Sequence, residues 1–183
     1  MRRASRPWSL LVLIALAGLL GPPAVASASD AGLQAVVKRD LAVQKRLNAV
    51  GTRLKAPSSR SFDAYVRYLR RSANHQSRIS RNVLALRRRY RAQQPQTTQA
   101  KRGRLLALRG HRDLANASGT SAGVLRRGIE EMTNAPTEGT YRAAGRRMLR
   151  LLKAQDRRYD RGNRRVSRGR TLILNAPWMP TSS

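Results

Sequence analysis

The most abundant reactive groups in this chain are guanidinium groups, and one series of them is spaced to occupy a single helix face. Eight cations between residues 142 and 168 fall within an arc of about 100° when the segment is projected as a helix. They are Arg142, Arg146, Arg150, Lys153, Arg157, Arg161, Arg164 and Arg168, and together they are called the cationic ridge. Because guanidinium groups bind phosphate in a bidentate way, the ridge predicts contact with an anionic polymer or surface.

Two further clusters of cations flank a turn that is predicted near Pro95. The first cluster is Arg87, Arg88, Arg89 and Arg91, and the second is Lys101, Arg102 and Arg104. Charge of one sign at this density destabilises the compact state through self-repulsion, which favours neutralisation by a polyanion. The alternative is a solvated surface whose only role is solubility.

The charge pattern predicts the chemistry of a partner without identifying it. Nucleic acid would be held through its phosphates, without sequence specificity, and the chain shows neither an RNA-binding aromatic pattern nor a helix-turn-helix spacing. Envelope phosphate polymers and anionic lipids are at least as accessible to an exported protein. A basic amphipathic helix can also lie on a membrane. Here the other helices compete for its apolar face, so we expect the intact bundle to bind.

The remaining reactive side chains form no catalytic or metal-binding pattern. The chain has two His, nine acidic residues and no Cys, so it has no thiol chemistry and no disulfides. On paired helices His75 and His111 would lie about 9 Å apart along the axis, and we interpret them as partly exposed and without a role. Glu130 and Glu131 are spaced for i,i+4 ion pairs with Arg126 and Arg127. We therefore expect no cofactor, no metal and no enzyme activity, and an enzyme of unrecognised chemistry is the less favoured alternative.

Residues 1–28 have the organisation of a secretory signal peptide. A basic start precedes the apolar run Trp8–Leu20, which is too short to span a bilayer comfortably. Small residues then provide a cleavage site after Ala28, and cleavage would retain most of the net charge of +29. We predict an exported protein of the cell envelope or its surroundings, with an uncleaved membrane anchor as the alternative.

Apolar residues recur at three- and four-residue steps through most of the remaining chain, which predicts four long amphipathic helices. The expected caps are Asp30 for the first helix, Ser61 for the second and Thr137 for the fourth. The first helix is expected to end near residue 55, and the third to cover residues 98–133. Small residues at 116–123 leave open whether this third helix is continuous or split by a loop.

Short links between these helices predict an all-α, up-down antiparallel bundle over residues 29–170. The fourth helix is expected to bury Tyr141, Ala144, Met148, Leu151, Leu152, Tyr159 and Val166, opposite the ridge. Residues 171–183 are expected to form an extended tail, since Pro177 and Pro180 are incompatible with a helix interior. Trp178 in this tail would pack over the bundle or dock on a partner. The alternative function is a structural protein that pairs with copies of itself or with an envelope partner and has no polyanion ligand.

Overall fold

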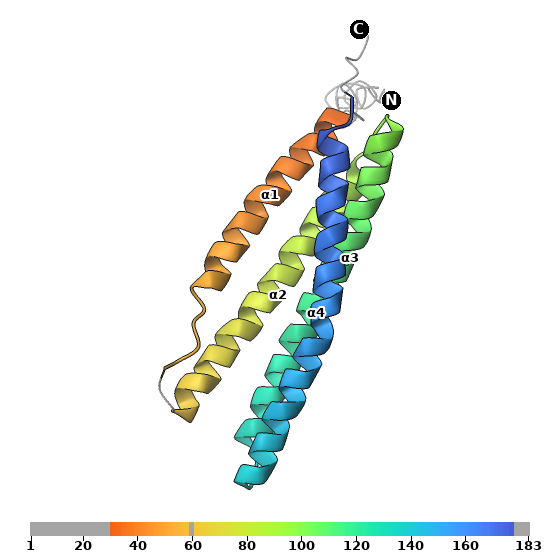
Figure 1. The fold of residues 1–183 in the computed structure, drawn as a ribbon. Helices are drawn as coiled ribbons and strands as arrows, with labels where there is room; N and C mark the ends of the chain where they lie inside the picture. The colour runs from red at the N-terminus through yellow and green to blue at the C-terminus, as the bar shows by residue number, and fades with distance from the viewer. Residues whose placement is uncertain (1–29, 59–60, 178–183) are drawn as a thin grey trace, which may run out of the picture.

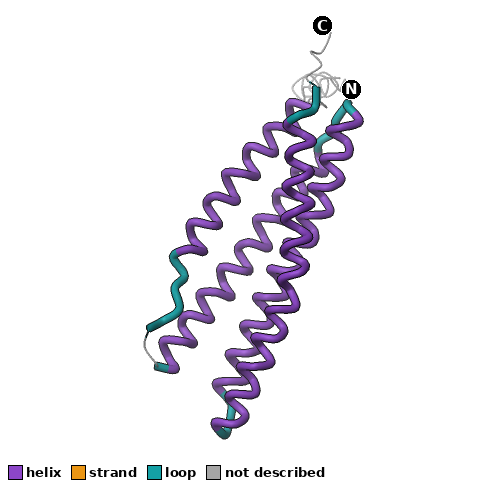
Figure 2. The backbone as a smooth tube through the Cα atoms, viewed as in Figure 1, coloured by secondary structure: helices purple, strands orange, loops and turns teal. Residues whose placement is uncertain are grey.

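The computed structural model describes residues 30–58 and 61–177, and this part of the chain is all-helical. Its helices are α1 (Asp30–Thr52), α2 (Phe62–Ala92), α3 (Thr98–Thr133) and α4 (Glu138–Leu174). Successive helices run antiparallel in an elongated bundle (Figure 1). Figure 2 shows short turns between α2 and α3 and between α3 and α4, and a longer connection between α1 and α2. The predicted all-α bundle of four helices is confirmed. The proposed signal peptide and Trp178 lie outside the described residues.

Three of the helices begin where side chains satisfy their first backbone N–H groups. The side-chain oxygens of Ser61, Thr97 and Thr137 each accept a hydrogen bond from the backbone N–H three residues later. At the start of α4, Thr140 also accepts from the backbone N–H of Thr137, which completes a capping box. Glu138 adds a favourable negative charge in the first turn of α4. The caps predicted at Ser61 and Thr137 are confirmed.

The start of α1 differs from its prediction. Asp30 is the first helical residue, and its carboxylate accepts hydrogen bonds from a different segment, the α2–α3 turn. The donors are the backbone N–H groups of Gln96 at 2.8 Å and of Thr97 at 3.3 Å, and the hydroxyl of Thr97 at 2.6 Å. Asp30 therefore anchors α1 to the α2–α3 turn. At its other end α1 stops at Thr52, three residues before the predicted end.

Helix α3 is unbroken, which settles the question raised by its small residues. The side chains of Ala115, Ala117, Ser118, Ser121 and Ala122 are all buried within it. Small side chains at these positions leave room for neighbouring helices to approach α3 closely. The segment at 116–123 is therefore a packing surface of a continuous helix.

Glycine allows the backbones of α3 and α4 to come almost into contact. A Cβ atom added to Gly110 would lie 2.7 Å from the carbonyl oxygen of Gly162, and one added to Gly103 would lie 2.7 Å from that of Gly169. Both distances are shorter than real Cβ contacts. The two glycines on each helix are seven residues apart, the spacing at which a helix presents the same face to its partner. This glycine seam fixes both the separation and the rotation of α4 against α3.

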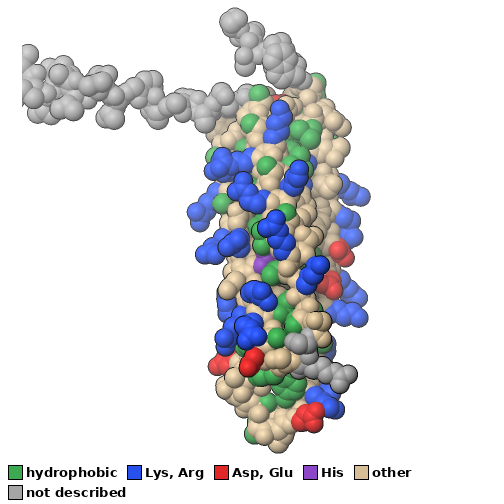
Figure 3. Space-filling model, turned by 90° about the vertical axis from the view of Figure 1, so that its left-hand side faces the viewer, with side chains coloured by type: hydrophobic (Ala, Val, Ile, Leu, Met, Phe, Trp, Pro, Cys, Tyr) green, Lys and Arg blue, Asp and Glu red, His purple; other side chains and the backbone are tan. Residues whose placement is uncertain are grey.

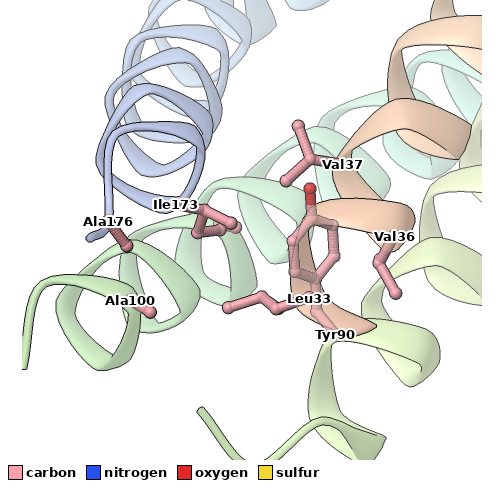
Figure 4. Close-up of a cluster of buried hydrophobic side chains, with 8 residues drawn as sticks. Leu33, Val36, Val37, Tyr90, Ala100, Ile173 and Ala176 are labelled. Atoms are coloured by element: carbon pink, nitrogen blue, oxygen red, sulfur yellow. The ribbon is translucent and has the colours of Figure 1, made fainter. Parts of the chain in front are cut away.

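Two apolar clusters fill the bundle. One lies where all four helices meet and includes Leu33, Val37, Tyr90 and Ile173, with Tyr90 surrounded by α1 side chains (Figure 4). The other lies towards the opposite end, among α2, α3 and α4. Its buried members are Val66, Leu69, Ala73, Leu125, Ile129, Met132, Ala144 and Met148. Helix α1 is shorter than the others and contributes only to the first cluster.

Two predictions for the fourth helix are wrong. Leu151 was expected in the core, but 43% of its surface is exposed. The buried seam includes Ala144, Met148 and Val166, as predicted, and also Gln155, Gly162 and Gly169. Because glutamine is polar and glycine has no side chain, the apolar periodicity gave these last three positions no weight.

The extended tail was also expected to begin at residue 171, but α4 continues to Leu174. Ile173 is completely buried among α1, α2 and α3 side chains. Its burial stabilises one more helical turn before Pro177.

The glycine seam predicts that adding one methyl group at a seam glycine strongly destabilises the fold. Gly110→Ala should lower the free energy of unfolding by about 1–3 kcal/mol, because its Cβ would overlap the Gly162 backbone. The matched control is Gly123→Ala in the same helix, where an added Cβ meets nothing within 4 Å. This control should raise the stability by about 0.5–1 kcal/mol through its higher helix propensity. Urea unfolding measures both, and equal effects of the two changes would contradict the close approach.

Candidate polyanion surface and buried polar cluster

The structure places all eight side chains of the cationic ridge at the surface. They follow one side of α4, and at about 100° per residue their mean direction is opposite the buried seam of that helix. The seam includes Met148, Gly162, Val166 and Gly169, which face α3. The packing of α4 against α3 therefore orients the ridge away from the bundle.

Most ridge cations have no acidic partner. Arg142 pairs with Glu138 one turn away, and Arg161 lies 3.5 Å from the carboxylate of Asp113. Within the described residues, no carboxylate lies within 4.0 Å of the other six. These six are Arg146, Arg150, Lys153, Arg157, Arg164 and Arg168. Asp160 lies within the same arc of the helix and is the one acidic side chain inside the ridge.

Cations on the flanks of α4 behave differently, because acids on α3 neutralise them. Arg165 donates to Asp113 at 2.6 Å, and Arg147 lies 3.4 Å from Glu131. The intrahelical pairs predicted for Glu130 and Glu131 do not form among the described residues. Glu131 reaches across to α4 instead, since the interhelical contact offers it a closer guanidinium group.

The two clusters beside the α2–α3 turn divide into exposed and structural residues. Arg88, Arg89, Arg91, Lys101 and Arg102 are exposed. Arg87 and Arg104 are half-buried, and the Arg104 guanidinium donates to the backbone carbonyls of Arg91 and Gln93. Arg104 therefore closes the turn, which corrects its assignment as a ligand for a polyanion. The same contact shows that the two clusters lie close together at this turn.

Cationic side chains also occur beyond these sets. Figure 3 shows Lys and Arg along most of one face of the molecule, with few acidic side chains among them. The ridge is thus one part of a broadly positive surface. What distinguishes it is a row of cations on one rigid helix.

The structure reveals a second polar feature, a buried cluster to which each helix contributes one side chain. Asp40 from α1 is 2% exposed and accepts hydrogen bonds from Tyr90 of α2 at 2.9 Å and from Arg170 of α4 at 2.7 and 3.0 Å. His111 of α3 lies 3.1 Å from the same carboxylate through Nε2. Arg170 also donates through Nη1 to the side-chain oxygen of Gln44 at 2.6 Å. This Asp40 cluster joins all four helices through one carboxylate.

His111 is bound on both sides of its ring. Its Nδ1 lies 2.7 Å from the carbonyl oxygen of Ala107, and its Nε2 faces the Asp40 carboxylate. Both partners are hydrogen-bond acceptors, so the ring is held between the α3 backbone and the Asp40 carboxylate. The ring is 1% exposed, which corrects the prediction of a partly exposed histidine without a role.

The environment of Asp40 keeps it ionised. Burial acts to raise the pKa of Asp40, but hydrogen bonds from His111 and Arg170 and their charges outweigh it, lowering the pKa from 3.8 to about 2. The same burial, together with the Asp40 charge, raises the pKa of Tyr90, so that Tyr90 remains a hydrogen-bond donor. The cluster is thus an ionised carboxylate with a complete set of donors.

Sequence reasoning missed the Asp40 cluster, although one signal was present. Asp40 occurs in phase with the apolar residues of α1, three residues after Val37 and seven before Leu47, both of which are buried. An acid at such a position requires a buried partner. Nothing in the sequence indicated that the partners would come from three other helices.

Several other observations bear on function. Within the part of the chain that the structure describes, no group of three or more His, Cys, Asp or Glu side chains is placed to hold a metal ion. No described helix has an apolar stretch long enough to cross a membrane. Comparisons with known protein families, with curated proteins and with solved structures find no match.

The lowered pKa of Asp40 predicts a defined acid sensitivity. The cluster's contribution to stability is fully present above about pH 4, where the unfolded Asp40 is also ionised, and is lost as the pH falls towards about 2. Asp40→Asn should lower the free energy of unfolding by about 3–5 kcal/mol at neutral pH, because it leaves the buried Arg170 guanidinium without its paired charge. It should also flatten the pH dependence between about pH 4 and pH 2.

The control for this measurement is Asp156→Asn, at an exposed acid on α4 that forms no ion pair with any residue the structure describes. Chemical unfolding followed by circular dichroism across this pH range compares the three proteins. Equal acid sensitivity in the wild type and in Asp40→Asn would show that Asp40 does not carry this dependence.

Proposed function

We propose that this chain is an exported, non-enzymatic helical protein that binds an anionic polymer or anionic surface of the cell envelope through its cationic ridge. The observation that carries the proposal is the row of six exposed cations on α4 that have no acidic partner in the described structure. Because these cations form no internal ion pair there, none has to be broken before a ligand phosphate can bind them.

The length of the row favours a polymer or a surface over a small anion. From Arg142 to Arg168 the ridge spans about 40 Å at 1.5 Å per residue. The Debye length at physiological ionic strength is about 8 Å, so one small anion can neutralise only a local part of the row. A polyphosphate, a phosphodiester polymer or a layer of anionic lipid headgroups can contact it throughout.

Rigidity of the ridge supports the same function. The glycine seam holds α4 against α3, so its cations are ordered along one line before any ligand binds. Binding then costs side-chain entropy but no reorganisation of the backbone. Nucleic acid can be held in the same way, through phosphates and without reading of base sequence.

The alternative, a structural or self-associating protein, requires an apolar surface left over after the bundle forms. Among the described residues, the large apolar side chains that remain exposed are distributed over all four helices. They are Leu41, Phe62, Leu84, Leu105, Leu149, Leu151 and Leu174. This distribution favours the cationic surface as the principal contact, and a mass that increases with concentration at high salt would support the alternative.

A charge-matched pair of variants tests the ridge. The ridge variant replaces its six unpaired cations with Gln. The control variant replaces six exposed cations on α1 and α2 with Gln and has the same net charge. Its positions are Arg39, Lys45, Arg67, Arg70, Arg71 and Arg81.

Binding to linear polyphosphate, duplex DNA and anionic vesicles is measured against salt concentration. For duplex DNA, the plot of log K against log salt concentration should become less steep in the ridge variant. Its slope should be smaller by about 5 than that of the wild type, since six phosphate contacts are lost and each contributes about 0.9. The control should keep most of the wild-type slope. Equal losses in both variants, or release of the wild-type protein below physiological salt, would overturn the proposal.

A further inference from the structure

A cavity of about 540 Å³ lies in the groove between α1 and α4. Figure 1 shows that the two helices lie closest at the start of α1 and the end of α4 and diverge from there. The Asp40–Arg170 ion pair joins them near the middle of α1. Ile79, Val83 and Leu86 of α2, with Leu114 of α3, line its floor. The volume is within the range of about 300–1,000 Å³ that is typical of small-molecule sites.

The lining of the groove separates apolar from polar groups. Aliphatic side chains form the floor, where Val83 and Leu86 are 6% and 4% exposed. Polar side chains without charge stand along the walls, among them Asn48, Asn163 and Ser167. This arrangement suits a ligand with an apolar chain and one polar end.

The closed end of the groove selects the charge of that polar end. Arg170 is the one Lys or Arg side chain in the lining, and its contacts with Asp40 and Gln44 use three of its five N–H groups, which leaves at most two for a ligand. Asp40 is the one acid in the lining, and its oxygens already accept from Arg170, Tyr90 and His111. An anionic headgroup therefore finds a guanidinium group there, while a cationic headgroup finds only a carboxylate that is already paired and the neutral oxygens of the walls.

We propose that this groove binds a single-chain amphiphile with a carboxylate headgroup. The carboxylate lies at Arg170, and the alkyl chain runs along the aliphatic floor towards the wider end between α1 and α4. The site is separate from the cationic ridge, since Asn163, Ser167 and Arg170 lie on a different side of α4. The inference is therefore independent of polyanion binding.

Titration of the full chain with decanoate, below the concentration at which it forms micelles, tests the site by isothermal calorimetry. Ser167→Trp should block the groove and weaken binding at least tenfold, and Asn163→Trp should do the same. Both positions are exposed, so the fold should tolerate the larger side chain. The matched control is Ala154→Trp, at an exposed position on α4 that does not line the groove.

The expected result is saturable binding of one decanoate to the wild type, to Ala154→Trp and to the ridge variant with six Gln substitutions. Decylamine should bind at least tenfold more weakly. Equal binding of decylamine, unchanged binding in both blocking variants, or loss of binding in the ridge variant would overturn the proposal. Binding to phosphatidylglycerol vesicles without binding to monomeric decanoate would also overturn it, because the contact would then be with a lipid surface.

Discussion

The close approach of α3 and α4 is the constraint on which the rest of the molecule depends. At Gly103, Gly110, Gly162 and Gly169 the two backbones nearly touch, and this contact leaves α4 only one rotation about its axis. The ridge cations are spaced three, four and seven residues apart, so they then lie on the side of α4 that faces away from α3. A looser packing with larger side chains would allow α4 to turn, and the ridge would lose its defined direction.

The few acidic residues complement this arrangement. Asp40 and Asp113 lie at contacts between helices and pair with Arg170 and Arg165 of α4. The buried carboxylate of Asp40 joins four helices, so it specifies the position of α1, which is shorter than the other helices. A buried ion pair can favour one packing arrangement over its competitors. Because these two acids pair mainly with Arg165 and Arg170, which lie off the ridge, they leave most of the outward row of cations unpaired within the described structure.

The sequence predicted the helices well because their signals are local. Apolar periodicity, the caps at Ser61 and Thr137 and the breaks at Pro95 and Pro136 act within a few residues. The placement of the ridge at the surface also followed from the spacing of its cations. The predictions for Arg104, His111 and Leu151 were wrong because the burial and partners of these side chains depend on contacts between helices. Such contacts leave no local signal in one sequence.

The hidden features share a physical cause. The glycine seam was missed because a glycine contributes nothing to hydrophobic periodicity, although it permits the closest helix contact. The Asp40 cluster was missed because its members lie up to 130 residues apart. The groove beside it results from the divergence of α1 from α4, which is a property of the assembled bundle. An acid in phase with buried residues, such as Asp40, was the one available clue.

The most direct test of the central claim observes the arginine side chains themselves. The Nε–Hε signals of the guanidinium groups are recorded by nuclear magnetic resonance while short-chain polyphosphate is added at physiological salt. If the ridge is the binding surface, the signals of Arg146, Arg150, Arg157, Arg164 and Arg168 will shift first and saturate together, while those of exposed arginines on α1 and α2 stay near their starting positions. Equal shifts of all exposed arginines would contradict the account and show that the protein attracts polyanions only through its overall charge.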